Sequence, residues 1–197
     1  IPFRCGPDYE PLSLDDRVRR GAVLTLFPGE PREVRLLGVH LKSGCGRRGL
    51  DDPREACALL AEQAAPLERW IDGEAAAGHV FAVLGDFNRD LLADTGPELN
   101  AAGRLRSLWA AIDDGDPPAA DLADAAAGEA FRNCTPAQNF GGYIDHILLS
   151  PPLAQRRRPG GFHRITYDPQ DALQRRLPDH CPVAVDLESP GSPGSDH

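Results

Sequence analysis

The sequence lacks a long apolar run, an initiator methionine and an excess of positive charge. No stretch approaches about 20 consecutive apolar residues, so no transmembrane helix is encoded. The chain opens with Ile1-Pro2-Phe3-Arg4, without an initiator Met, which indicates a processed product or a fragment. No signal peptide is visible, and the sequence leaves open whether a targeting segment is missing. The formal net charge of −9 repels polyphosphate at long range and argues against a passive nucleic-acid-binding module. It still permits an enzyme that contacts one phosphate through a bound cation.

Cysteine pairs of the CxxC type are also missing, although the chain has five cysteines. A structural zinc site is therefore disfavoured. The odd and fairly high count instead favours an oxidising compartment, so we expect a secreted or periplasmic protein, with a cytoplasmic one as the alternative. Cys45 and Cys57 are the first candidate disulfide, and Cys134 could pair with Cys181, which leaves Cys5 over. Five reduced thiols are the competing interpretation.

What is present fits one globular domain. The chain has 197 residues, of which 41% are apolar and 26% charged, enough for a real core. We find no internal repeat and no second domain, and assign residues 1–188 to the single domain. The Ser/Pro/Gly-rich tail at 189–197 is expected to be disordered. Arginine pairs such as Arg47-Arg48 indicate either a local basic rim or, more often, solvated surface.

The apolar periodicity predicts an α/β (α+β) layered domain with largely antiparallel strands. Two β-branched runs around a Pro-Gly turn are typical of a hairpin. Asp52-Pro53 followed by Glu55 predicts a helix start, and apolar residues at helical spacing follow it to Ile71. The expected strands are 22–27, 34–41, 80–84, 143–149, 182–187 and a weaker one at 162–166, and a second helix is expected at 103–112.

Four strand ends carry polar, titratable residues where an apolar run stops. They are Gly38 to Gly44 with His40, Gly85-Asp86-Phe87-Asn88, Tyr143-Ile144-Asp145-His146, and Pro178-Asp179-His180-Cys181. A charge inside a buried strand costs several kcal/mol unless it is paired or metal-bound. Carboxylates gathered at one rim of a sheet sandwich repel one another, and a divalent cation relieves that repulsion. Such oxygen-rich sites favour Mg²⁺, Mn²⁺ or Ca²⁺ over zinc.

Each motif alone also has an ordinary structural explanation. Gly-Asp-x-Asn is common in turns, because Asp and Asn bond their own backbone. A lone His40 is more often a satisfied core or edge residue, and Asp145 could be a structural buried acid. His146 faces the opposite side of its strand by the period of two, so we leave it out of the site. The specificity lies in the combination and its order.

That combination resembles the endonuclease/exonuclease/phosphatase superfamily over nearly the whole chain. The resemblance implies the deoxyribonuclease-I-like four-layer αββα fold, incomplete at its N-terminal side, with this chain as the C-terminal two-thirds. His40-Leu41-Lys42-Ser43-Gly44-Cys45 is similar to a bacterial branch. The superfamily's first strand with its Asn, and the metal-binding Glu that follows, have no counterpart here. Pro178 replaces the usual Ser before Asp-His.

The resemblance also implies a role for each matching residue. Asp86 orients or deprotonates the attacking water and lies at the metal, and Asn88 holds phosphate and nucleophile in line. His180 contacts the scissile phosphate and transfers a proton, while Asp145 fixes its tautomer. The remaining two roles, metal-side carboxylate and stabiliser of phosphoryl charge, belong to Asp179 and His40.

The function expected from this resemblance is Mg²⁺-dependent hydrolysis of phosphoesters, with Mn²⁺ or Ca²⁺ as alternative ions. A phosphodiesterase or nuclease acting on DNA or RNA comes first. A lipid or inositol phosphate phosphoesterase of the same fold is an alternative, and a catalytically inactive binding protein is another. We expect a monomer. Because the substrate-selecting loops carry no readable motif, the sequence leaves the choice of phosphoester open.

Overall fold

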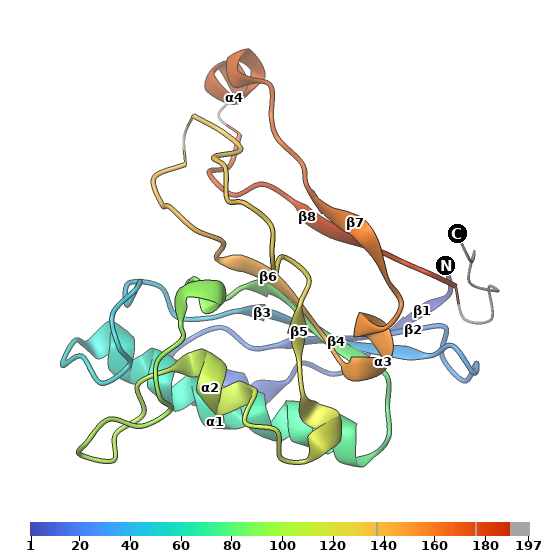
Figure 1. Ribbon diagram of the computed structural model, residues 1–197, viewed down its shortest axis with the longest axis horizontal. Coiled ribbons are helices and arrows are strands. Elements are labelled where there is room, and N and C mark those ends of the chain that lie inside the picture. Colours follow the sequence, from blue (N-terminus) through green and yellow to red (C-terminus); the bar gives the residue numbers. More distant parts are fainter. Residues whose placement is uncertain (137, 176, 190–197) are drawn as a thin grey trace.

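The computed structural model describes residues 1–136, 138–175 and 177–189. Within them, a six-stranded sheet forms the middle of the molecule, α1 and α2 cover one face, and a two-stranded sheet lies over the other (Figure 1). The expected disordered tail lies, apart from Ser189, outside the described residues. The strands are β1 (Phe3–Cys5), β2 (Ala22–Leu26), β3 (Val34–His40), β4 (Phe81–Asp86), β5 (Ala123–Asp124), β6 (Asp145–Leu149), β7 (Arg157–Arg164) and β8 (Val183–Leu187).

The helices are fewer and mostly short. They are α1 (Glu55–Ala76), α2 (Leu108–Ile112), α3 (Pro151–Ala154) and α4 (Pro169–Arg175), with 3-10 turns at Glu10–Ser13, Leu91–Ala93 and Pro118–Ala120. In the described part of the chain, no helix is long and apolar enough to span a lipid bilayer.

The connections explain the strand order β1-β2-β3-β4-β6-β5. The expected hairpin is present, because β2 pairs with β3 in antiparallel register. The long helix α1 then carries the chain back across the sheet, so β4 runs parallel to β3. β6 pairs antiparallel with β4. The C-terminal end of β4 therefore meets the start of β6 at one edge.

Some expected boundaries were wrong. The expected helix cap, Asp52, lies before the helix: Arg54 is the N-cap residue, and Asp52 accepts a hydrogen bond from its N–H at 3.1 Å. The second helix begins at Leu108 rather than 103, because Gly103 has a positive φ of 72° in a turn and Ser107 caps the helix. The weak strand expected at 162–166 is the longer β7.

Apolar side chains pack on both faces of the large sheet. Leu60, Leu67 and Ile71 of α1 pack with Leu37 and Val83 on one face. The core on the other face lies between the sheets and contains Ala82 of β4, Ile147 and Leu149 of β6, and Phe162 of β7.

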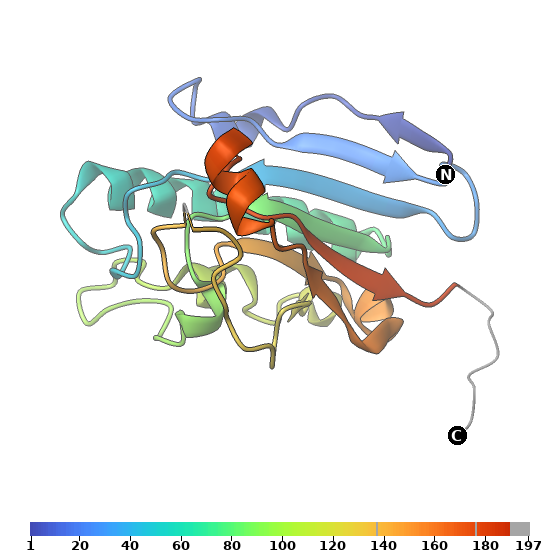
Figure 2. The same cartoon turned by 90° about the horizontal axis from the view of Figure 1, so that it is seen from above.

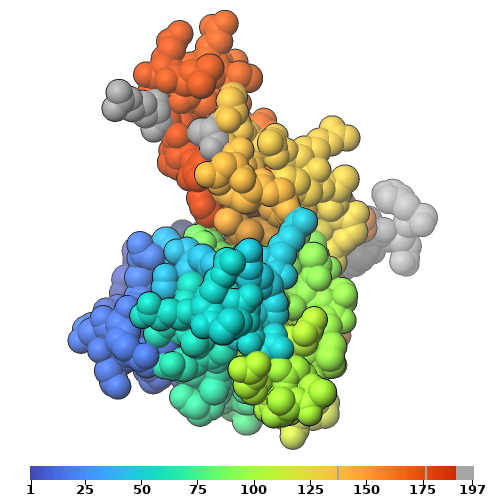
Figure 3. Space-filling view, turned by 90° about the vertical axis from the view of Figure 1, so that its left-hand side faces the viewer, coloured from blue at the N-terminus to red at the C-terminus, as the bar shows by residue number. Residues whose placement is uncertain are grey.

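The second sheet covers only part of the first. Seen from above, β7 and β8 lie on the side of β4 and β6 and leave β1 and β2 uncovered (Figure 2). Viewed along the strands, the orange and gold C-terminal part stands on the blue-to-green lower part (Figure 3). Three of the four layers expected of the αββα fold are thus present in the described residues: the helices α1 and α2, the large sheet and the small one.

Candidate active site

Three adjacent strands bring three of the predicted residues side by side. His40 at the end of β3 is the register partner of Asp86 at the end of β4, and Asp86 is the partner of Asp145 at the start of β6. Paired residues on neighbouring strands share a face of the sheet. Ala82 has the parity of Asp86 and lies in the core between the sheets, so all three side chains are on the face of β7 and β8.

A tight backbone approach holds the end of β4 in place. Gly85 has a φ of 137°, and a Cβ atom there would lie 2.0 Å from the carbonyl oxygen of Val39. Only glycine fits such a position. The glycine before Asp86 is therefore a structural requirement for packing β4 against β3.

The turn after β4 is closed by the Asp86 carboxylate. Its Oδ1 accepts the backbone N–H of Asn88 at 2.7 Å, and its Oδ2 accepts the Asn88 amide at 2.9 Å. The same amide donates to the carbonyl of Leu41 at 3.0 Å, next to His40. Asn88 has a φ of 53°, a left-handed conformation that Asn tolerates well. Both residues of the Gly-Asp-x-Asn motif are fixed by one local network.

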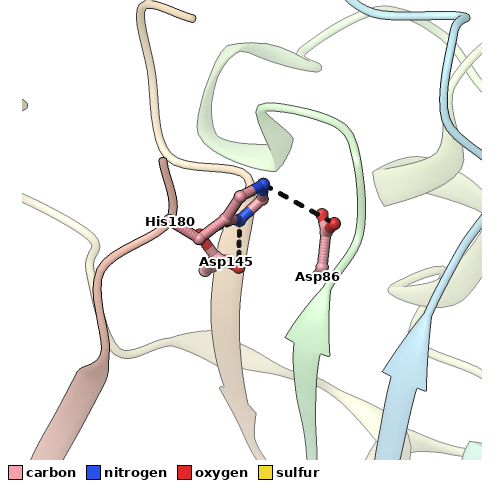
Figure 4. Close-up of side chains that lie close together, drawn as sticks. All are labelled: Asp86, Asp145 and His180. Carbon is pink, nitrogen blue, oxygen red and sulfur yellow. Dashed lines mark hydrogen bonds and ion pairs between the residues drawn. The ribbon is translucent and has the colours of Figure 1, made fainter. Parts of the chain in front are cut away.

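His180, from the segment before β8, completes the group (Figure 4). Its Nδ1 lies 3.0 and 2.9 Å from the two carboxylate oxygens of Asp145. Its Nε2 lies 4.0 Å from Oδ2 of Asp86, and Nε2 of His40 lies 3.4 Å from the same oxygen. Asp86 is thus the centre, with an imidazole on either side.

Charge and burial act on this group in opposite directions. Burial raises the pKa of Asp86, and the neighbouring Asp145 adds to the rise, while the Asn88 N–H and the two histidines oppose it. Burial by itself would lower the pKa of His180, but the hydrogen bond and charge of Asp145, with the charges of Asp86 and Asp179, raise it instead. A nearby positive charge would stabilise both carboxylates in their ionised form.

The donor atoms fit a hard divalent cation. Ligand atoms of Asp86, Asp145 and His180 all lie within 4.8 Å of one another. Two neighbouring carboxylates, whose negative charges repel each other, supply the oxygen ligands that Mg²⁺ and Mn²⁺ prefer. Asp179, the other predicted metal-side residue, is not part of this group and lines an adjoining cavity with His180. Among the described residues, this group contains no glutamate.

A buried ion pair supports the site from the opposite face. His146 is fully buried, with Nδ1 2.6 Å from Oδ2 of Asp124. Its Nε2 lies 3.0 Å from the carbonyl of Arg89 and 3.1 Å from that of Tyr143, one on each loop of the site. The structure thus places His146 outside the reacting group, as expected, but sequence reasoning missed Asp124. The two residues are 22 positions apart, and no local motif connects them.

Both expected cysteine pairs are bonded. Cys45 is linked to Cys57, and Cys134 to Cys181, directly after His180. Cys5 is free and exposed. The second disulfide ties the His180 segment to the loop that leads toward β6.

Solved structures of other proteins share this fold. No curated protein sequence matches the chain. The 3′ phosphatase NExo from Neisseria, solved with a product DNA hairpin, is 22% identical, with a TM-score of 0.58 over 95% of this chain and 70% of that one. An AP endonuclease from Archaeoglobus fulgidus is 12% identical, with a TM-score of 0.54 over 86% of this chain and 65% of that one. At these identities the likeness confirms the fold.

The family assignment comes from a sequence model rather than from these structures. The model of the Endonuclease/Exonuclease/phosphatase family matches residues 7–197, which includes all four predicted strand-end motifs. The chain therefore belongs to the endonuclease/exonuclease/phosphatase family.

Proposed function

We propose that the chain is a divalent-metal-dependent phosphodiesterase that hydrolyses nucleic acid. The observation that carries the proposal is the alignment of His40, Asp86 and Asp145 on three adjacent strands, with His180 bound to Asp145. This group combines a water-activating carboxylate with two imidazoles in one place. Similar folds described as a 3′ phosphatase and an AP endonuclease support nucleic acid as the substrate.

Each residue has a task that its contacts support. Asp86 orients the attacking water and accepts its proton, and burial, which raises its pKa, makes it a better base than an exposed aspartate. Asn88, whose amide N–H groups are engaged by Asp86 and Leu41, holds the Asp86 carboxylate in place and can accept a hydrogen bond from the attacking water through Oδ1. His180 contacts the scissile phosphate through Nε2, because Nδ1 is engaged by Asp145. His40 donates to the charge that develops on the transferring oxygens.

A divalent cation completes the proposal. Asp86, whose carboxylate lies within 4.8 Å of donor atoms of Asp145 and His180, would be its central ligand, and once bound it would neutralise charge on the phosphoryl oxygens. The family resemblance adds Asp179, which lies outside that close group, as a second ligand. Asp145 is the less suitable ligand, because both of its oxygens are engaged by His180. Calorimetric titration with Mg²⁺ or Mn²⁺ tests this assignment directly. Asp86→Asn and Asp179→Asn should each weaken ion binding, and unchanged binding in both variants would reject the ligand set.

The activity test is nicking of supercoiled plasmid with Mg²⁺ or Mn²⁺ against EDTA. Wild type should nick only with metal, and Asp86→Asn should lower the rate at least about 10³-fold, because the base is lost while the turn geometry is kept. His180→Ala should act in the same direction. Asp186→Asn, on the exposed face of β8, is the matched control. Full activity of Asp86→Asn would contradict the mechanism.

The remaining outcomes separate the alternatives. Absence of nicking with intact metal binding would direct the search to inositol phosphates and lipid headgroups. Absence of metal binding as well would favour a non-catalytic binding protein.

Further proposals concern the whole chain. The two disulfides support an oxidising compartment, either secreted or periplasmic. We further propose that residues 1–188 form one domain and that the protein is a monomer. Counting free thiols under denaturing conditions should give one without reductant, in line with the single free Cys5, and five with reductant.

A further inference from the structure

A cavity of about 570 Å³ opens directly beside His180. Its walls are the loop after β3, the turn after β4 and the loop before β6, together with Asp179. The volume lies within the range of small-molecule sites, about 300 to 1,000 Å³. The proposed mechanism uses Asn88 and His180 on its rim and leaves the rest of the cavity unassigned.

The most exposed cation of the cavity wall is Arg47. Its side chain is 67% exposed, yet its Nη2 donates to Oδ2 of Asp90 and to the carbonyl oxygen of Gly141 on the opposite wall. The described contacts occupy only Nη2, so the N–H groups of Nε and Nη1 are left, each able to donate a charge-assisted hydrogen bond to an anion. Figure 3 shows the cyan part of the chain reaching the gold part at this point.

The loop that carries Arg47 is held rigidly. Arg89 is buried and donates from Nη1 to the carbonyl oxygens of Gly46, at 3.2 Å, and Arg48, at 2.6 Å, on either side of Arg47. The Cys45–Cys57 disulfide fixes the same loop two residues earlier. Arg89 itself is neutralised by Asp94, at 2.6 and 2.8 Å. Arg47 is therefore preorganised, and it is the exposed cation of this wall, with Asp90 as its partner on one side.

The facing wall supplies an aromatic ring. Phe140 is half-buried, and its ring lies 5.1 Å from that of His180, centre to centre. The chain passes so close to the Arg47–Asp90 pair that a Cβ atom on Gly142, whose φ is 135°, would lie 2.1 Å from Oδ2 of Asp90. Only glycine fits at such a position, so the placement of the Phe140 loop is built into the sequence.

We propose that this cavity, between Arg47 and Phe140, binds one nucleotide unit next to the scissile phosphate. Arg47 binds the phosphate of that unit and Phe140 stacks on its base, as aromatic side chains do in single-strand binding sites. A sugar phosphate or lipid headgroup would use Arg47 but has no flat ring to place on Phe140. The inference rests on the proposed function, because the neighbouring phosphate is the one that is cleaved there.

The test is the affinity of the intact chain for deoxyadenosine 5′-monophosphate, measured by calorimetry with Mg²⁺ present. Arg47→Gln should weaken binding about tenfold, the usual effect of losing a charge-assisted hydrogen bond. Arg48→Gln is the matched control, because Arg48 is the exposed neighbour whose side chain turns to Asp52. Phe140→Leu keeps an apolar group and should weaken nucleotide binding severalfold.

Ribose 5-phosphate distinguishes the ligand classes. Its affinity should fall in Arg47→Gln but stay unchanged in Phe140→Leu. Equal affinities for the nucleotide in Arg47→Gln and Arg48→Gln would overturn the proposal, and so would the absence of nucleotide binding to wild type at millimolar concentration. Equal loss of both ligands in Phe140→Leu would overturn base stacking.

The nicking assay and the nucleotide-binding assay test the proposed hydrolysis and the proposed cavity site separately. A chain that nicks plasmid but binds nucleotide independently of Arg47 would keep the hydrolase and reject the cavity assignment. A chain that does not nick but binds nucleotide through Arg47 would reject nucleic-acid hydrolysis and keep nucleotide binding by the cavity. Because Arg47 is exposed, equal melting temperatures of Arg47→Gln and wild type verify that the variant is folded.

Discussion

Both carboxylate oxygens of Asp145 lie within hydrogen-bond distance of a single nitrogen, Nδ1 of His180. Such an arrangement keeps the proton on Nδ1 and leaves Nε2 directed toward Asp86, 4.0 Å away. It also raises the pKa of His180 against the opposing effect of burial. We therefore propose that Asp145 acts through His180 rather than on the substrate, as a positioning residue.

Replacing that carboxylate with an amide tests this role. Asp145→Asn should lower kcat by about 10² to 10⁴, because a neutral partner neither fixes the tautomer nor stabilises the protonated ring. KM for an oligonucleotide should change little, since Asp145 does not line the cavity beside His180. Steady-state kinetics on a short labelled oligonucleotide measure both constants. Asp171→Asn on exposed α4 is the control, and a kcat within twofold of wild type in Asp145→Asn would contradict the role.

The residues predicted from sequence share one property: they lie at or near one end of an apolar run. His40, Asp86 and Asp145 stand where strands begin or end, so the pattern marks them and the sheet brings them together. Arg47 and Phe140 lie in loops without periodicity, where neither residue type indicates which way the side chain points. Their relation depends on the contact of Arg47 with Gly141, 94 residues away, which no local pattern encodes.

The disulfides act on two different elements of the site. Cys45–Cys57 joins the Arg47 loop to the first turn of α1, and Cys134–Cys181 holds the segment of His180. Sequence separations of 12 and 47 residues correspond to about 3 and about 4 kcal/mol of stabilisation through the unfolded chain. The two disulfides should therefore contribute similarly to the free energy of unfolding, but their removal should change kcat and KM differently.

Pairwise replacement by serine separates these effects. Cys134→Ser with Cys181→Ser should lower kcat, because His180 loses its covalent anchor. Cys45→Ser with Cys57→Ser should mainly raise KM for nucleotides, because the Arg47 loop loosens. Urea unfolding gives the stabilities and steady-state assays give the constants, with Cys5→Ser as a control. Identical kinetic profiles of the two double variants would show that the disulfides support the fold alone.

Long elements were easier to predict than short ones. The β2–β3 hairpin and α1 have many residues in phase, so their pattern is unambiguous. The strands β1 and β5 have three and two residues, too few for a period, and were missed. Likewise α2 is only five residues long, and its start depends on capping by Ser107. Periodicity indicated a layered α/β domain, and the family resemblance supplied the four-layer αββα arrangement.

The whole molecule is acidic although its proposed substrate is a polyanion. With a net charge of −9, the long-range field repels nucleic acid, and we expect attraction at Arg47 and at the proposed cation. Salt screens the repulsion over about 10 Å at 0.1 M. The net charge should therefore slow the encounter of the protein with nucleic acid, and electrostatic attraction should act only at short range.

This predicts an unusual response to salt for a nuclease. Raising NaCl from about 20 to about 150 mM at fixed Mg²⁺ should leave kcat/KM for an oligonucleotide unchanged or raise it. A protein that neutralises many phosphates would lose affinity steeply over the same range. Initial rates at subsaturating substrate measure the effect. A tenfold fall in kcat/KM would show an extended basic surface that the charge distribution does not reveal.

The alignment of His40, Asp86 and Asp145 across β3, β4 and β6 has a consequence for how such enzymes diversify. Backbone hydrogen bonds set the spacing of adjacent strands at about 4.8 Å, so the sheet itself fixes the distances between these three residues. The cavity walls, in contrast, are loops attached to the ends of those strands. Exchange of the segments at 43–49 and 138–142 between relatives should therefore transfer substrate preference and leave the geometry of the reacting residues unchanged.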